Sequence, residues 1–343
     1  MKLALHMQQM DANVARYVND GRMPSVKLVL YEDQTISENP FPNTRTIGRV
    51  WIGGDGVEKE YVDRGFQGGQ DYFERLADFY RRHPWVHAWE AANEYGVDGG
   101  KQIANLCQFT MGWGERMHQA GLKTVGFSIS VGWPRPEDMW LFGDYDFECL
   151  DYIGLHEYSA PHMYDRATWH CLRYQRTFAY WGKPILITEC GIDGGVEPVY
   201  KPQHGWKTFC SREEYWQQLQ WYNHELEQDD AVVAAFAFTS VPEKTWQAFD
   251  FDATLSGWLR DAHLAEQTIE EKILAAALQH GISVAPGTAL FDYIERHGWH
   301  VQDEERDVAG YRFRRAYDDD HREYIAYCPI GQWHLVRHME VPK

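Results

Sequence analysis

The sequence predicts a (β/α)8 barrel with a small C-terminal α+β module, and three observations support that prediction. Short apolar runs rich in β-branched residues, which suit buried parallel strands, recur eight times. Amphipathic stretches lie between them, and a regular alternation of strand and helix is typical of a parallel barrel. Loops rich in glycine and proline follow several strand ends, as at 131–137 and 191–206.

The elements follow in order along the chain. The predicted strands cover residues 2–6, 25–31, 45–52, 86–92, 124–130, 151–156, 184–189 and 232–239. The predicted helices include 70–82, 101–120, 165–180 and 212–228. An open doubly wound sheet is the competing architecture, but no G-x-G-x-x-G motif follows an early strand, so nucleotide binding lacks its usual marker.

Length and element count divide the chain near residue 265. Single barrels of about 250 residues are common, so we expect residues 1–265 to form the barrel and 266–343 to form a separate module. The module is expected to contain helices near 268–280 and 289–297 and strands near 309–316, 322–328 and 333–340. Self-association and contact with a cell wall are the roles left open for it.

Composition narrows the class of partner. The formal net charge is −18, and such a surface repels phosphate backbones, so no nucleic-acid partner is expected. No run of 18 apolar residues occurs, so no membrane partner is expected either. The first six residues resemble a strand and not a signal peptide, which makes the chain cytoplasmic, exported by a route without a signal peptide, or already processed.

Cysteine and histidine spacing gives no metal or redox motif. The six cysteines show no C-x-x-C spacing, and we interpret them as buried free thiols in preference to a Cys171–Cys210 disulfide. His156-Glu157 begins like the H-E-x-x-H zinc motif, but Ala160 stands where the second histidine is needed. No metal and no organic cofactor are expected.

Two glutamates are the strongest functional signal. Glu94 closes the segment that contains the fourth predicted strand, and Glu189 ends the seventh. The strands of a parallel barrel deliver such side chains to one rim, and two carboxylates are the minimum needed to cleave a glycosidic bond, one as proton donor and one as nucleophile or base. The rival interpretation of Glu94 is an ordinary surface or helix-capping glutamate. Glu90 lies deeper in the same strand and is expected to be a buried polar brace.

Three neighbours strengthen this interpretation. Asn93 places an amide beside the acid, where it can hydrogen-bond the 2-hydroxyl of a sugar, a contact that strengthens in the transition state. His156 and Tyr158 are two residues apart on the sixth strand, so both side chains point to one face. The tyrosine hydroxyl can donate to Glu189 there and keep it ionised. The alternative for both is a satisfied core residue.

The pattern of Asn93-Glu94, His156-x-Tyr158 and Glu189 resembles the retaining glycoside hydrolases of clan A over residues 1–265. The resemblance implies a (β/α)8 fold, Glu94 as general acid/base and Glu189 as nucleophile. It also implies that Asn93 contacts the sugar and that Tyr158 supports the nucleophile. One departure stands out, because many members carry a tryptophan at the end of the eighth strand, where this chain has Phe238-Thr239-Ser240.

Aromatic side chains make up 15% of the chain, and some are expected to line a sugar-binding cleft. The remaining candidates for substrate contacts lie on or near strand ends and are Trp51, Trp133, Trp206, Trp246, Arg49 and His6. We favour Trp51 and Trp133 as subsite platforms. Arg49 and His6 suit glycone hydroxyls, with bracing of the barrel as the alternative for both.

These observations leave two functions from different classes. The first is a retaining glycoside hydrolase that cleaves a β-linked oligosaccharide or polysaccharide by double displacement. The second is a catalytically silent carbohydrate-binding barrel in a cell-wall- or phage-associated assembly, and the tail loosely resembles modules of such proteins. An aldolase-like barrel would need a lysine at a strand end for a Schiff base, and Lys123 and Lys183 precede their strands.

Overall fold

The computed structural model describes residues 1–164, 170–177, 182–278, 290, 294, 297–302, 305–308, 310–330 and 336–341. The chain divides into two compact units, Met1–Asp261 and Ala262–Lys343. The first unit contains the closed parallel barrel and the second contains an antiparallel sheet, so the predicted fold class is confirmed.

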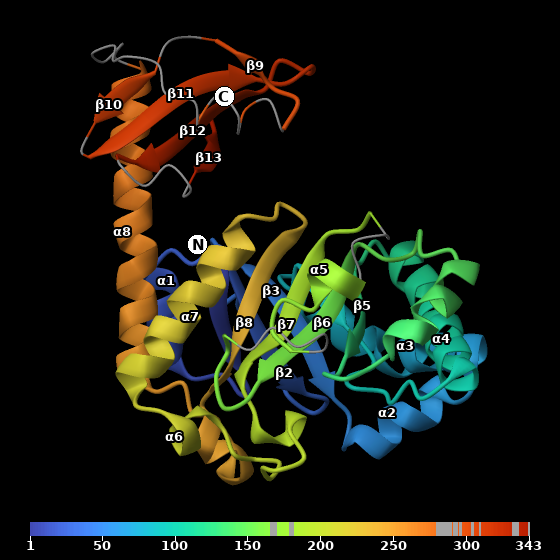
Figure 1. The fold of residues 1–343 in the computed structure, drawn as a ribbon. Coiled ribbons are helices and arrows are strands. Elements are labelled where there is room, and N and C mark those ends of the chain that lie inside the picture. Colours follow the sequence, from blue (N-terminus) through green and yellow to red (C-terminus); the bar gives the residue numbers. More distant parts are fainter. Residues whose placement is uncertain are drawn as a thin grey trace. The chain divides into compact units, whose positions relative to one another are not determined.

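Eight parallel strands close the barrel in sequence order, β1 to β8, with β1 paired to β8. Figure 1 shows the strands gathered at the centre of this unit with helices around them. Their bounds are β1 Leu3–Met7, β2 Ser25–Tyr31, β3 Arg45–Trp51, β4 Ala88–Glu90, β5 Thr124–Ile129, β6 Tyr152–Ser159, β7 Ile185–Ile192 and β8 Val232–Ser240. All eight strands lie within or close to the predicted ranges.

The barrel interior changes from apolar to charged along the strands. A buried cluster with members from six strands fills the amino-terminal end and consists of Ala4, Ile47, Ala88, Val125, Leu186, Ala234 and Phe236. Side chains alternate along a strand, so the residue two positions later points to the same side. Those positions hold His6 on β1, Arg49 on β3 and Glu90 on β4, all buried. The next layer of this interior is therefore polar.

The helices surround the barrel. They are α1 Ala12–Asp20, α2 Asp55–Val62, α3 Gly65–Arg82, α4 Gly100–Gln119, α5 Tyr174–Thr177, α6 Trp206–Phe209, α7 Arg212–Glu227 and α8 Ala253–Leu278, with 3₁₀ turns η1 Pro136–Asp144, η2 Gly194–Val196 and η3 Lys244–Phe249. Helices α3 and α4 approach closely because Gly112 faces α3, where an added Cβ would lie 2.1 Å from the Phe66 carbonyl oxygen. Of the predicted helix 165–180, residues 165–169 and 178–180 lie outside the described residues.

The second unit is built on a five-stranded sheet. Its strands are β9 His300–Val301, β10 Arg306–Val308, β11 Tyr311–Tyr317, β12 Glu323–Pro329 and β13 Arg337–Glu340. One face of the sheet packs Phe313 and Ile325 against Ile273 of α8, and the other packs Ala316 and Ala326 against residues 290 and 294. The short strands β9 and β10 were not predicted. The predicted helix 289–297 and strand 333–340 lie partly outside the described residues.

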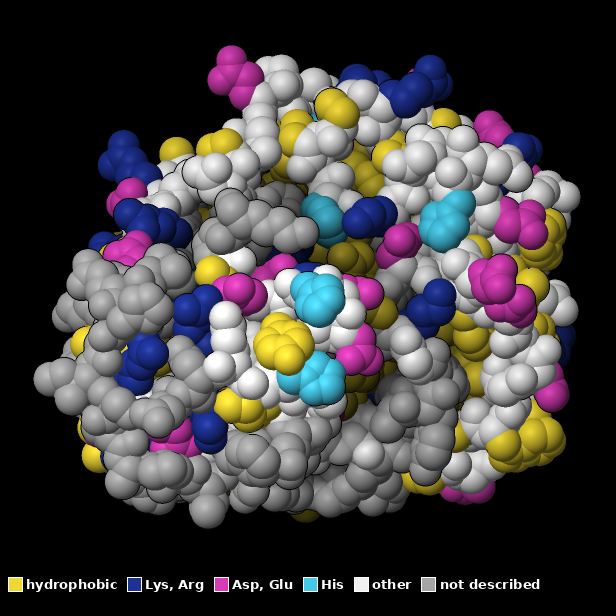
Figure 2. Space-filling view, turned by 90° about the horizontal axis from the view of Figure 1, so that it is seen from above, with side chains coloured by type: hydrophobic (Ala, Val, Ile, Leu, Met, Phe, Trp, Pro, Cys, Tyr) yellow, Lys and Arg dark blue, Asp and Glu magenta, His cyan; other side chains and the backbone are white. Residues whose placement is uncertain are grey.

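The described surface carries charges of both signs, and the cysteine thiols differ in burial. On the face shown in Figure 2, acidic and basic side chains are interspersed, and the sheet of the second unit carries ion pairs such as Arg312–Asp307 and Arg315–Glu323. All six cysteines are free, and two of them, Cys149 and Cys210, are only half-buried, which corrects the expectation that all would be buried. No described helix has the length and apolar character needed to cross a bilayer.

Candidate active site

Glu94 reaches the barrel mouth from a loop and not from the end of a strand. Strand β4 ends at Glu90, four residues earlier than the predicted strand-end position of Glu94. The cause is the backbone, because Ala92 (φ 62°) and Glu94 (φ 50°) take the left-handed conformation, which no regular strand contains. A hydrogen bond from the Glu94 amide to the carbonyl of Ser128, at 3.1 Å, still ties the loop to the neighbouring strand β5.

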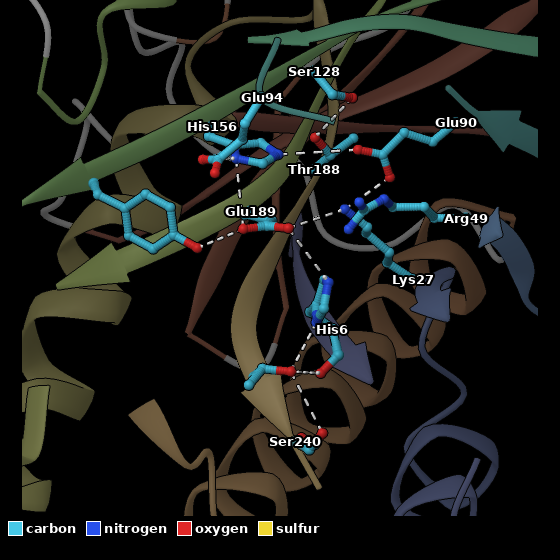
Figure 3. A network of polar contacts seen from close by, with 12 residues as sticks. His6, Lys27, Arg49, Glu90, Glu94, Ser128, His156, Thr188, Glu189 and Ser240 are labelled. Carbon is cyan, nitrogen blue, oxygen red and sulfur yellow. Dashed lines mark hydrogen bonds and ion pairs between the residues drawn. The ribbon is translucent and has the colours of Figure 1, made fainter. Parts of the chain in front are cut away.

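Glu189 lies inside strand β7, which continues to Ile192. Its two carboxylate oxygens have separate partners (Figure 3). Oε2 accepts a hydrogen bond from the Tyr158 hydroxyl at 2.8 Å and lies 3.5 Å from His156 Nδ1. Oε1 lies 3.5 Å from Lys27 Nζ and 3.7 Å from His6 Nε2. Four side chains from three other strands therefore fix this carboxylate.

His156 connects the two glutamates. Its Nδ1 lies 2.8 Å from Glu94 Oε1, and one ligand atom from each of Glu94, His156 and Glu189 falls within 4.8 Å of the other two. Residues 94 and 189 therefore meet across one pocket mouth. Glu189 is buried, whereas the Glu94 side chain is 42% exposed and is open to a ligand.

Charge sharing in this cluster moves three pKa values. Full burial of Glu189 and partial burial of Glu94 oppose their ionisation, but His156 outweighs this effect. The pKa of Glu94 falls to about 2 and that of Glu189 falls below its ordinary value, with Lys27 assisting the second. Burial likewise disfavours the charged imidazole, yet the carboxylates of Glu189, Glu90 and Glu94 raise the pKa of His156 to about 9. At neutral pH the proton of the His156–Glu94 pair therefore lies on the histidine.

The same three side chains have the donor types of a metal site. A metal-binding histidine must be neutral. Because its pKa is about 9, His156 holds a proton at neutral pH and donates to Glu94. A metal ion would therefore have to displace the proton that His156 shares with Glu94.

A second layer of charge lies directly beneath Glu189. Lys27 of β2 and Glu90 of β4 are both buried, and their Nζ and Oε2 atoms are 2.7 Å apart. Glu90 is thus the buried brace expected from the sequence. Lys27 was missed, and it bears on the aldolase alternative, because a lysine does point into the barrel. The sequence did contain a signal for it, because Lys27 is the only charged residue in the strand Ser-Val-Lys-Leu-Val-Leu-Tyr.

Asn93 and Arg49 both contact Glu58, which lies beside the same cavity as Glu94. The Asn93 amide nitrogen donates to Glu58 Oε2 at 3.2 Å, while its side-chain oxygen is buried without a hydrogen-bond partner among the described residues. Arg49 lies 3.5 Å from the same Glu58 oxygen and is buried. A cavity of about 160 Å³ opens beside Asn93 and Glu94, with Lys59 of α2 on its wall.

An aromatic cluster around Phe238 of β8 includes Tyr158, the residue that donates a hydrogen bond to Glu189. Phe238 occupies the place where the clan A pattern has a tryptophan, and its ring lies 5.0 Å from His6, 6.2 Å from Tyr158 and 5.7 Å from Trp246. Trp246 of η3 is half-buried and joins this cluster. Phe238, which was not among the predicted site residues, therefore packs against two side chains, Tyr158 and His6, that contact Glu189.

The other tryptophans are placed differently. Trp51 is half-buried at the end of β3, with Arg49 5.7 Å from its ring. Trp133 is half-buried, and its carbonyl accepts a hydrogen bond from Arg173. Trp206 is buried and stacks on Tyr215 at 5.0 Å, so it packs the core and is not available as a platform.

Comparison with known proteins supports the fold. No protein-family model and no curated protein sequence matches this chain. A GH128 (subgroup I) endo-β-1,3-glucanase variant from Amycolatopsis mediterranei, in complex with laminaritriose and laminaribiose, is similar at 15% identity, with 76% of this chain and 99% of that chain covered and a TM-score of 0.50.

Two further solved structures are more distant. An endo-β-1,6-glucanase is similar at 12% identity over 99% of this chain and 89% of its own, with a TM-score of 0.46. A GH30 endoxylanase from Clostridium papyrosolvens has 12% identity over 96% and 81%, with a TM-score of 0.43. The closed parallel barrel and the likeness to the GH128 glucanase structure confirm, at the level of the fold, the resemblance inferred from the sequence.

Proposed function

We propose that this chain is a retaining glycoside hydrolase that cleaves a β-linked glycan, with Glu189 as nucleophile and Glu94 as general acid/base. The observation that carries the proposal is the approach of the two carboxylates to within 4.8 Å of each other and of the His156 imidazole. Retaining enzymes hold their carboxyl groups about 5–5.5 Å apart, whereas inverting enzymes need about 6.5–9.5 Å to admit water. The spacing favours double displacement.

In the first step Glu189 attacks the anomeric carbon while the leaving oxygen takes a proton from Glu94. The resting site stores that proton on His156, 2.8 Å from Glu94 Oε1. A bound sugar excludes water from the exposed Glu94 carboxylate and raises its pKa. When Glu189 bonds to the sugar, its carboxylate becomes a neutral ester. The negative charge that is lost is one of those that raise the pKa of His156. Both changes move the proton onto Glu94 as the bond breaks.

In the second step Glu94, now ionised, accepts a proton from water, and that water displaces the sugar from Glu189 with net retention. Asn93 lies directly before the acid and is our candidate for the 2-hydroxyl contact. Phe238 and Trp246 supply an apolar surface beside the reacting sugar, and Trp51 and Trp133 remain candidates for more distant subsites. The cavity beside Glu94 offers room for the leaving sugar.

The proposal is tested with aryl glycosides and with xylan, mannan, glucan and peptidoglycan. Wild-type protein should cleave at least one substrate, and Glu189→Ala should abolish turnover. A 2-fluoro glycoside of the active sugar should accumulate as an adduct on the peptide that contains Glu189. Azide should rescue Glu94→Ala with a β-glycosyl azide product and Glu189→Ala with the α-anomer, because only the former retains the nucleophile. An adduct on another residue contradicts the assignment.

A carbohydrate-binding barrel without turnover is the second candidate, and one observation favours it. Glu94 is ionised in the resting site, since its pKa is about 2, and an ionised glutamate cannot act as an acid until a substrate changes its surroundings. Isothermal titration with the same glycans separates the two functions. Binding without cleavage by wild type, with equal binding by Glu189→Ala, would support the silent barrel.

A further inference from the structure

A buried lysine in the barrel interior is the feature that the proposed chemistry leaves unexplained. Lys27 and Glu90 have fully buried side chains, and their charged atoms are 2.7 Å apart. Barrel interiors are ordinarily filled by branched apolar side chains, and lysine is almost never fully buried without a partner. The pair joins β2 to β4, and Figure 3 shows it on the side of Glu189 opposite to the tyrosine ring.

Stability does not account for this pair. Removing two ions from water carries a large desolvation cost, and well-packed apolar side chains in place of a buried ion pair are often equally stable or more stable. The apolar cluster just below shows that this barrel accepts such packing. A charged pair in this position is therefore better explained by what it does for its neighbours.

The neighbour that Lys27 contacts is the proposed nucleophile. Its Nζ lies 3.5 Å from Glu189 Oε1, on the opposite oxygen from the one that Tyr158 and His156 contact. Glu90 holds Lys27 from the other direction and itself has Oε1 4.0 Å from His156 Nε2. Despite burial, Lys27 and then His156 keep the pKa of Glu90 far below its ordinary value, so Glu90 remains a charged anchor.

We propose that Lys27 is a positioning residue for Glu189 and that Glu90 anchors it: Lys27 keeps the Glu189 carboxylate ionised and fixes its Oε1, while Tyr158 fixes Oε2. The inference rests on the proposed role of Glu189. It goes beyond that role by assigning the layer beneath the mouth to the orientation and charge state of the nucleophile. The positive charge of Lys27 interacts with two carboxylates, those of Glu90 and Glu189. Lys27 therefore lowers the pKa of Glu189, whereas Glu90 weakens that effect by attracting the same charge.

The decisive measurement is the pKa of Glu189, determined by monitoring its side-chain carboxyl signal with ¹³C NMR as the pH is changed. The signal is assigned as the one that is lost in Glu189→Gln. Lys27→Met with Glu90→Leu removes both charges without leaving either one buried alone. We expect this double variant to fold and the pKa of Glu189 to rise by about one unit or more, because an opposite charge within about 4–6 Å lowers a carboxyl pKa by about 1–3 units. Lys123→Met, at an exposed lysine before β5, is the matched control.

Glu90→Gln is the second variant, and it secures the test if the double variant does not fold. Its amide oxygen can still accept from Lys27, and its neutral side chain leaves the lysine charge undivided. We expect the pKa of Glu189 to fall. His156 stays protonated in the acid range where Glu189 titrates. His6 lies 3.7 Å from Glu189 Oε1 and takes up a proton in that range, so each variant is also compared with its parent in a His6→Asn background. A Glu189 titration unchanged from wild type in either folded variant overturns the proposal.

The NMR readout needs no turnover, so it separates this inference from the proposed function. If the wild type cleaves no glycan but the Glu189 pKa rises in the double variant and falls in Glu90→Gln, the positioning role stands and the hydrolase proposal fails. If turnover is present, the acid limb of kcat/KM should move with the same sign. A rise of one pKa unit corresponds to a tenfold loss of kcat/KM well below that pKa.

Discussion

Raising the pH should destabilise the barrel through His156. Its pKa is about 9 in the folded chain against 6.5 for an ordinary histidine. The folded state therefore holds a proton that the unfolded state has lost, and stability falls as pH rises from about 6.5 through about 9. A shift of about 2.5 units is worth about 3 kcal/mol. About 2 kcal/mol of this should disappear between about pH 6.5 and 8.5.

Burial also raises the pKa of Glu157, which makes stability fall with rising pH in the same sense, so the difference between wild type and His156→Asn isolates His156. Two further kinds of group titrate outside the window. Burial lowers the pKa of His6 to about 3, with Lys27 assisting, so His6 makes stability fall as pH drops below about 6.5. Burial raises the pKa of Cys107 well above its ordinary value and that of Cys149 to about 11, and these thiols reduce stability only above about pH 8.5. The change in slope that His156→Asn causes between about pH 6.5 and 8.5 therefore reports on His156.

Urea unfolding followed by far-UV circular dichroism at half-unit steps of pH measures the effect. The wild type should lose stability across the window, and His156→Asn should show a smaller slope there. The exposed His162 provides a matched control, because His162→Asn should retain the wild-type slope. Parallel curves for wild type and His156→Asn would show that the proton is not on His156, and the proposed proton route would then fail.

Three further substitutions have effects that can be predicted from the structure. Tyr158→Phe removes the 2.8 Å hydrogen bond to Glu189 and should lower kcat by about 10- to 100-fold, since a hydrogen bond to a charged group is worth about 1.5–3 kcal/mol; an unchanged kcat would contradict the role of Tyr158. Phe238→Ala, at a residue only 7% exposed, should cost about 3–5 kcal/mol in urea unfolding and should raise KM if its ring lies under the sugar. Gly112→Ala should destabilise the α3–α4 contact by about 1–3 kcal/mol, because its new Cβ would lie 2.1 Å from a backbone oxygen. Gly143→Ala is its control, since nothing lies within 4 Å of the added carbon, and equal losses in both variants would refute the steric argument.

The sequence was sufficient to predict the barrel because strand periodicity and spacing are local properties. The eight strands lie near their predicted ranges, and residues 94 and 189 meet although they are far apart in the chain. The loop after β4 was beyond local analysis. Ala92 and Glu94 have no intrinsic preference for a left-handed backbone, so their conformation is imposed by tertiary contacts such as the bond to Ser128.

The polar layer beneath the mouth was missed for a related reason. Lys27 lies in a run of apolar residues, and whether such a lysine points into the barrel or out of it depends on the shear of the closed sheet, which no single strand encodes. Phe238 was recorded as a departure from a pattern, although in three dimensions it contacts Tyr158 and His6. The strands that form the site were predicted correctly. The direction of individual side chains and their neighbours on other strands were not.

Charge balance inside the barrel explains why one proton matters to the whole site. Three carboxylates, those of Glu90, Glu94 and Glu189, face Lys27 and a protonated His156, which leaves one excess negative charge. Neutralising Glu189 by bond formation removes that excess. The proton on His156 is then held less tightly, because the first charge that raises its pKa is gone. In the proposed mechanism, Glu94 is ionised at rest and receives its proton from His156 as Glu189 forms its bond to the sugar.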